Sequence, residues 1–374
     1  MGAGYSLQMI IYFIRSKFMS KGLYIHVPFC VRKCPYCDFF SVTDLSLREA
    51  YTEAVIRNIR ALNDSFSTVY FGGGTPSLLT EEQIHRILSA AEILPGAEIS
   101  MEANPGTADE DYLRNVRSAG INRISLGVQS FDNGELKSLG RIHSSEEAVS
   151  AILSAEKAGF ENISADLMLA VSGQTPATLR RNLETVVSLP LTHISAYMLK
   201  VESGTPLSLD NELLEKIPDE DETAEMYLEA VNFLENQGFE QYEISNFAHN
   251  GFECRHNLGY WKCGEYYGIG CSAHSFIDGE RFCCRDSLRE FIASPIQGKV
   301  SLGSGGDAGE RAMLALRLTK EGIPANLFPG LEERSKPLVR KGLMKKEQGF
   351  LKLTPEGCLV SNEIIIFCGL TDMN

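Results

Sequence analysis

The feature that most constrains the fold is a regular alternation of short apolar segments with segments of helical periodicity, which begins near residue 22. The segments that predict strands lie at 23–27, 69–71, 98–102, 123–128, 162–169 and 193–197. Those that predict helices lie at 46–62, after the capping residue Thr80, and at 108–118, 145–158, 176–189 and 220–237. Short buried strands that alternate with helices are typical of a parallel sheet. Six such units are fewer than the eight of a closed barrel. We therefore predict an α/β fold with an open, partial (β/α)6 barrel.

The alternation ends near residue 295, and the remaining segments predict a smaller unit. Residues 301–307 are rich in Gly and Ser and predict a linker. A helix at 310–318 and a helix–hairpin–helix pattern over 338–368 then resemble a small winged-helix-like α+β domain. The predicted division is an N-terminal extension at 1–19, a core at 20–250, a connector at 251–300 and a C-terminal domain at 301–374.

The extension 1–19 is excluded from the fold prediction. Residues 7–14 are apolar, and Arg15 and Lys17 follow them. This pattern fits a short membrane-touching segment or a start placed too far upstream, with Met19 as the true first residue, and we favour the second.

Charge and cysteine content limit the classes of function. The 374 residues include 35 Lys and Arg against 49 Asp and Glu, a net charge of −14 that repels phosphate backbones. We therefore predict no nucleic-acid partner. The ten cysteines occur without a cleavable leader or an apolar stretch of the roughly 20 residues that a membrane span needs. Metal-binding thiols in a reducing cytoplasm explain them better than disulfides.

Three cysteines directly after the first predicted strand predict an iron–sulfur cluster. Cys30, Cys34 and Cys37 form a CxxxCxxC motif, and thiolates are the usual ligands of such clusters. Three ligands for four irons leave one iron open to a chelating molecule. The alternative is a structural zinc site, which needs a fourth ligand that His26 could supply.

Later strand ends carry residues suited to a small polar ligand. Gly72, Gly73 and Gly74 end the second predicted strand, where missing side chains allow close backbone approach. Glu102 and Gln129 end the third and fourth strands. The carboxyl ends of parallel strands meet at one face, so we expect these groups to share a site.

These motifs together resemble the oxygen-independent coproporphyrinogen III oxidase family of radical S-adenosylmethionine proteins. The resemblance covers the segment 24–40 around the cysteines and the motif GGGTP at 72–76, and extends over most of the chain. It implies a 4Fe–4S cluster on the three cysteines and S-adenosylmethionine as a second cofactor. The residues it implies for cofactor contact are Tyr24, Tyr36, Gly73, Gly74, Thr75, Glu102, Gln129, Arg141 and Asp166. Glu102 would bind the ammonium and Arg141 the carboxylate. One departure is that Ala170 and Ser172 replace a turn Gly and Pro of the family.

Two branches of this family differ in residues that the chain allows us to compare. The coproporphyrinogen dehydrogenases carry a further cysteine where this chain has Phe39, and a longer segment before the cluster motif than the fewer than 30 residues here. The HemW-type haem chaperones carry the motif HNxxYW, which this chain has at 256–261. A neutral imidazole ligates haem iron well, so His256 is the first candidate for the haem ligand. A structural role for His256 remains the alternative, with Cys254, Cys263, Cys271, His143, His249 and His274 as weaker ligand candidates.

The resemblance therefore implies a cytoplasmic haem chaperone that binds haem, the cluster and S-adenosylmethionine. Such a protein would deliver haem to membrane respiratory enzymes, with peripheral membrane contact and a homodimer left open. No catalytic residue is assigned. The alternative is oxygen-independent coproporphyrinogen III dehydrogenation in haem biosynthesis, against which Phe39 counts. A third alternative, radical modification of RNA, predicts a basic module that this acidic chain lacks.

Overall fold

The computed structural model describes residues 20–294 and 296–371. The predicted extension 1–19 and the interpretation of Met19 lie outside the described residues. Within them, no helix is long and apolar enough to cross a membrane.

A single sheet runs through most of the described chain, in the strand order β12-β11-β10-β9-β1-β2-β3-β4-β5-β6-β8-β7. Its centre consists of β1 (Lys21–Val27), β2 (Ser65–Gly73), β3 (Glu92–Ala103), β4 (Arg123–Gln129), β5 (Asn162–Leu169) and β6 (His193–Met198). These strands are parallel and follow one another in chain order. The predicted partial (β/α)6 barrel is confirmed.

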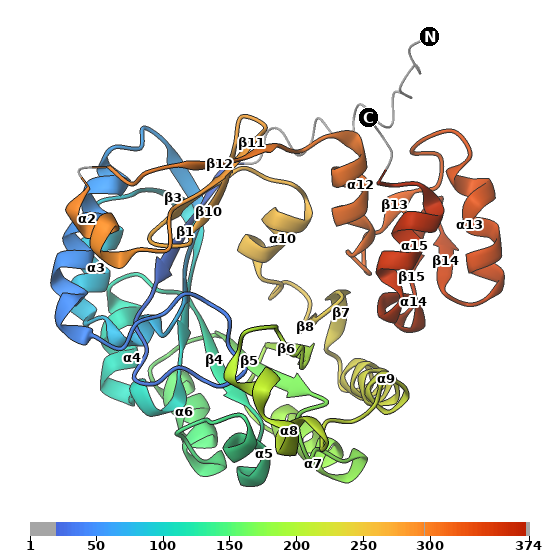
Figure 1. Ribbon diagram of the computed structural model, residues 1–374, viewed down its shortest axis with the longest axis horizontal. Helices are drawn as coiled ribbons and strands as arrows, with labels where there is room; N and C mark the ends of the chain where they lie inside the picture. Colours follow the sequence, from blue (N-terminus) through green and yellow to red (C-terminus); the bar gives the residue numbers. More distant parts are fainter. Residues whose placement is uncertain (1–19, 295, 372–374) are drawn as a thin grey trace.

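Helices between the strands cover the outer face of the curved sheet (Figure 1). They are α2 (Arg48–Arg60), α3 (Glu81–Ser89), α4 (Glu110–Ser118), α5 (Asn133–Ser138), α6 (Ser145–Lys157), α7 (Pro176–Val187), α8 (Asn211–Leu214) and α9 (Glu220–Asn236). Short 3-10 turns lie at Leu45–Leu47, Pro76–Leu78, Pro105–Thr107 and Pro206–Leu209. Thr80 caps α3 in a reciprocal pair with Gln83, as its place in the sequence predicts. Leu23, Ile25 and Val27 of β1 are fully buried in the core.

Strands that the sequence did not reveal extend the sheet on both sides. The elements are β7 (Glu240–Glu243), β8 (Asn246–Ala248), α10 (Arg255–Trp261), β9 (Tyr266–Ile269), β10 (His274–Ile277), β11 (Glu280–Cys283), α11 (Leu288–Ala293) and β12 (Val300–Ser304). β9 pairs in parallel with β1, and β8 pairs antiparallel with β6. The predicted linker is wrong for residues 301–304, because β12 pairs with β11. Partner pairing satisfies the backbone there in spite of weak strand propensity.

The C-terminal elements form a smaller unit with its own three-stranded sheet, β13-β15-β14. They are α12 (Ala308–Leu316), β13 (Ile323–Pro324), α13 (Leu331–Arg340), β14 (Met344–Glu347), β15 (Phe350–Leu353), α14 (Pro355–Leu359) and α15 (Ser361–Cys368). Figure 1 shows this unit beside α9 and α10, away from the helices that follow β2 and β3. Lys320 ties it to the barrel through ion pairs with Glu240 at 2.7 Å and Glu253 at 3.0 Å. The exact domain boundaries stay a prediction.

Candidate functional site

A cavity of about 400 Å³ opens at the carboxyl ends of the parallel strands. Its lining brings together the three predicted cluster ligands and every predicted cofactor-binding residue except Tyr24 and His256. These lining residues are Cys30, Cys34, Cys37, Tyr36, Gly73, Gly74, Thr75, Glu102, Gln129, Arg141 and Asp166. The cavity lies within the usual size of small-molecule sites, about 300–1,000 Å³. Residues spread over more than 130 positions of sequence meet here because parallel strands present their ends at one face.

The cysteine loop is fixed at its base and open toward the cavity. The Cys30 amide donates to Val42 O at 2.9 Å, and the Val42 amide donates to Pro28 O at 2.7 Å. Each of the three thiols is only partly buried. The Thr75 hydroxyl lies 3.7 Å from Cys30 Sγ, and Arg141 Nη1 lies 3.6 Å from Cys34 Sγ. Donors aimed at sulfur stabilise thiolates and tune cluster potential.

The arrangement fits a cluster better than a zinc ion. His26, the fourth ligand in the zinc alternative, contacts Tyr24 OH at 3.2 Å through Nδ1 and Phe40 O at 3.0 Å through Nε2. Both ring nitrogens are therefore used within the protein. Among the described residues, no three Cys, His, Asp or Glu side chains converge on a single-ion site. A cubane binds each thiolate at a different iron, so its ligands stand further apart than those of one metal ion.

The glycine run allows β2 to pack against the cysteine loop. Gly73 has φ +109°, and a Cβ there would lie 2.6 Å from the His26 ring. A Cβ on Gly74 would lie 2.7 Å from Phe29 O. Backbone atoms cannot move aside as a flexible side chain can, so only glycine fits at position 74. The Gly73 amide then donates to Glu102 Oε2 at 3.1 Å.

Two buried carboxyl groups line the cavity, and the pKa of each is raised. Burial, reinforced by the charge of Asp166, raises the pKa of Glu102 to about 7. Burial also raises the pKa of Asp166, which accepts a hydrogen bond from Ser125 at 3.1 Å. Tyr70 donates to Glu102 Oε1 at 2.9 Å. A cation placed beside Glu102 would favour its ionised form, which suits an ammonium ligand.

Two residues at this face of the barrel have a strained backbone. Gln129 has φ +68° and Ala170 has φ +56°, in the left-handed region that costs a non-glycine residue roughly 1 kcal/mol or more. Ala170 is the position where the chain departs from the family's glycine. The Ala170 amide donates to Gln174 Oε1 at 2.7 Å, which holds the turn in spite of the strain.

Sequence reasoning missed Asn104 and Tyr197, which also line the cavity. Asn104 Nδ2 donates to Thr75 Oγ1 at 2.9 Å, and its Oδ1 accepts from Arg141. Asn104 thereby links the segments that follow β2 and β3 to Arg141. Both residues stand at or just past the end of a predicted strand, and this position alone could have identified them.

The motif at 256–261 lies at the opposite, amino-terminal end of the strands, and its histidine forms hydrogen bonds within the protein. His256 on α10 is 2% exposed. Its Nδ1 contacts Thr68 Oγ1 at 2.8 Å and its Nε2 contacts Tyr260 OH at 2.7 Å. Burial, and then the charge of Arg123, lower its pKa to about 3. Both nitrogens tie α10 to β2 and to its own last turn, which favours the structural alternative for His256 over the predicted role as haem ligand.

The remaining candidates are distributed over separate places. Tyr24 lies outside the cavity, with its ring next to those of Tyr70 and His256. Cys254, Cys263 and Cys271 are buried. His143 is buried with Nε2 at 3.0 Å from Val128 O, His249 is half-buried with Nδ1 at 2.9 Å from Gly238 O, and His274 is exposed.

Comparisons with known proteins agree with this geometry. A profile of the Radical SAM superfamily matches residues 24–186. The heme chaperone HemW of Lactococcus lactis is 35% identical over 343 residues, which cover 89% of this chain and 87% of that protein. HemW of Bacillus subtilis is 33% identical over 92% of this chain and 98% of that protein. The chain belongs to the HemW family of radical SAM proteins.

The HemW family assignment confirms the resemblance drawn from the motifs, and superfamily membership implies a 4Fe–4S cluster and S-adenosylmethionine as cofactors. The fold agrees as well. Coproporphyrinogen III oxidase (HemN) of Escherichia coli, described as a radical SAM enzyme, superposes with a TM-score of 0.78 over 97% of this chain and 93% of that one. At 19% identity this likeness concerns the fold alone.

Proposed function

We propose that the chain is a cytoplasmic haem chaperone, which binds haem and passes it to haem-containing respiratory enzymes at the membrane. The observation that carries the proposal is the 33–38% identity with proteins named heme chaperone HemW over most of the chain. The cavity supports it with a residue set suited to the cluster and to S-adenosylmethionine.

Within this proposal, the residues at the carboxyl end of the barrel hold the two cofactors. Cys30, Cys34 and Cys37 bind three irons, Glu102 receives the ammonium of the methionine and Arg141 its carboxylate. When bound, the cluster and S-adenosylmethionine supply one-electron chemistry. Arg141 Nη2 donates a hydrogen bond to Gly127 O at 2.7 Å, which fixes the orientation of the side chain. Little side-chain entropy is therefore lost when the ligand binds.

The second candidate function, coproporphyrinogen III dehydrogenation, is disfavoured by one residue of the cysteine loop. Phe39 occupies the place of the further cysteine that we expect in that branch. It lines the cavity and is 62% exposed. An exposed aromatic ring at this position offers an apolar surface but no thiol.

Two measurements on anaerobically purified, cluster-loaded protein test the proposal. Haem titration should give a saturable Soret band, and incubation with S-adenosylmethionine, a reductant and coproporphyrinogen III should give no protoporphyrinogen fluorescence after oxidation. Efficient formation of protoporphyrinogen would establish the dehydrogenase instead. Absence of any haem-dependent Soret band would remove the chaperone function.

A further inference from the structure

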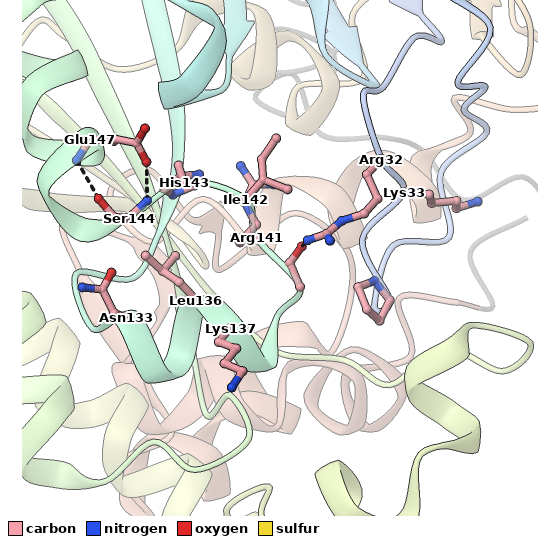
Figure 2. Close-up of a pocket in the computed structure, with 12 residues that line it drawn as sticks. Arg32, Lys33, Asn133, Leu136, Lys137, Arg141, Ile142, His143, Ser144 and Glu147 are labelled. Carbon is pink, nitrogen blue, oxygen red and sulfur yellow. Dashed lines mark hydrogen bonds between the residues drawn. The ribbon is translucent and has the colours of Figure 1, made fainter.

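A second hollow, of about 600 Å³, lies beside the cluster cavity between the cysteine loop and the segment 133–147. Figure 2 shows Arg32 and Lys33 of the cysteine loop on one side and Leu136 and Lys137 of α5 on the other, with Arg32 extending toward the α5 side. The two walls are in contact. Arg32 donates to Gly140 O, and a Cβ on Gly140 would lie 2.5 Å from Pro35 Cδ. The hollow is therefore a fixed feature of two packed loops.

The hollow is positively charged in a chain of net charge −14. Arg32, Lys33, Lys137 and Arg141 line it, and in the described part of the chain none of these four forms an ion pair with a carboxylate within 4.0 Å. The carboxylate in the lining, Glu147, accepts from the Ser144 amide at 2.7 Å as part of a helix cap. Cations without a carboxylate partner that line one concave surface favour an anionic ligand.

Apolar surface accompanies these cations. Ile142 is 58% exposed at the edge of the hollow, and Val31 is 53% exposed on the cysteine loop. Leu136 and Pro35 complete the apolar lining. A ligand that matches both features has a broad apolar body and more than one carboxylate. The concave shape favours a small molecule, because a protein partner typically covers about 800 Å² on each side.

We propose that this hollow binds the haem cargo, with the haem propionates on Lys33, Lys137 and Arg32 and the macrocycle against Ile142. The inference rests on the proposed function and gives the cargo a place next to the S-adenosylmethionine cavity, with Arg32 and Lys33 in the wall that the two hollows share. Since the hollow opens to solvent, an acceptor protein can reach the bound macrocycle.

The test measures the affinity of a charge-reversal variant and of a matched control variant for two ligands. One ligand is haem, and the other is haem dimethyl ester, which lacks the free carboxylates. Lys137→Glu reverses an exposed lysine in the last turn of α5, and Lys157→Glu reverses an exposed lysine in the last turn of α6, away from the hollow. Soret titration of cluster-loaded protein should show haem affinity reduced about tenfold by Lys137→Glu and within about twofold of wild type for Lys157→Glu. The dimethyl ester should bind wild type at least about tenfold more weakly and should not distinguish the variants.

Three other outcomes are informative, and each would refute a specific claim. If wild-type protein binds no haem, the proposed function fails. If wild type binds haem and Lys137→Glu or esterification leaves the affinity unchanged, the function stands and the propionate site is refuted. If Lys137→Glu instead slows only the reduction of the cluster by an acidic electron-carrier protein, the hollow is a docking surface for that protein and the inference is wrong.

Discussion

The two ends of the barrel use polar residues in opposite ways. At the carboxyl end, three half-buried thiols and two carboxyl groups of raised pKa line a cavity, and two residues there have strained backbones. At the amino end, His256 is buried with both ring nitrogens in hydrogen bonds to hydroxyl groups. Motif residues at both ends look equally functional in sequence. From this difference we infer that polar groups at a ligand site keep hydrogen-bonding capacity that the protein itself does not use, whereas polar groups with a structural role do not.

Removal of a thiol at the carboxyl end should have the largest effect. Cys34→Ala leaves two ligands for the cluster, so reconstitution with iron and sulfide should give almost no brown chromophore and no EPR signal on reduction. Cys34 is only partly buried, so the far-ultraviolet circular dichroism should match wild type. Cys283→Ser, at a partly buried thiol on β11 outside the cavity, is the control and should retain the cluster. A full cluster signal in Cys34→Ala would remove this cysteine from the ligand set.

Truncation at the amino end should cost stability and leave haem binding unchanged. His256→Ala leaves the Thr68 and Tyr260 hydroxyls without their partner and opens a cavity, which should lower the free energy of unfolding by about 2–4 kcal/mol. Urea denaturation measures this, with the exposed His85→Ala on α3 expected within about 0.5 kcal/mol of wild type. A shifted Soret band with unchanged stability would restore His256 as a haem ligand and break the comparison.

The raised pKa of Glu102 predicts a pH dependence for S-adenosylmethionine binding. An ammonium ligand requires the ionised carboxylate, and a pKa of about 7 leaves much of it protonated below neutral pH. Affinity should therefore rise as pH increases from 6 to 8, by up to about tenfold. Calorimetric titration should show the dependence lost and the affinity lowered in Glu102→Gln, whereas the exposed Glu82→Gln should behave as wild type. A pH profile that persists in Glu102→Gln would assign the titration to another group, with Asp166 the nearest.

Relief of strain at the carboxyl end should have the smallest effect. Ala170→Gly removes the side chain at φ +56° and should raise the free energy of unfolding by about 0.5–1 kcal/mol. Ala151→Gly in the middle of α6 is the opposite control, since glycine at a regular helical position should destabilise by about 1 kcal/mol or more. Equal destabilisation by both substitutions would mean that the turn at Ala170 is not strained.

The strands of the first half were predictable because each is bounded by turn or cap residues and follows its neighbour in the sheet. Residues 162–169 form β5 as expected, and Thr80 caps α3. The second half was not, because β9 to β12 span only four or five residues each, and β9 and β12 pair with strands that lie further away in the sequence. The Gly- and Ser-rich residues 301–304 form a strand only through their pairing with β11.

The cysteine motif, the glycine run and the polar strand ends were determined by sequence alone, since parallel strands necessarily bring their carboxyl ends to one face. Tertiary structure decided the surroundings of His256, whose partner Thr68 lies 188 residues away on β2. It also created the basic hollow, where Lys33 and Lys137 come from elements that are unrelated in sequence. Burial and hydrogen-bond partnership are non-local quantities, so a residue's chemistry can be read from its type, but its availability to a ligand depends on what the fold packs against it.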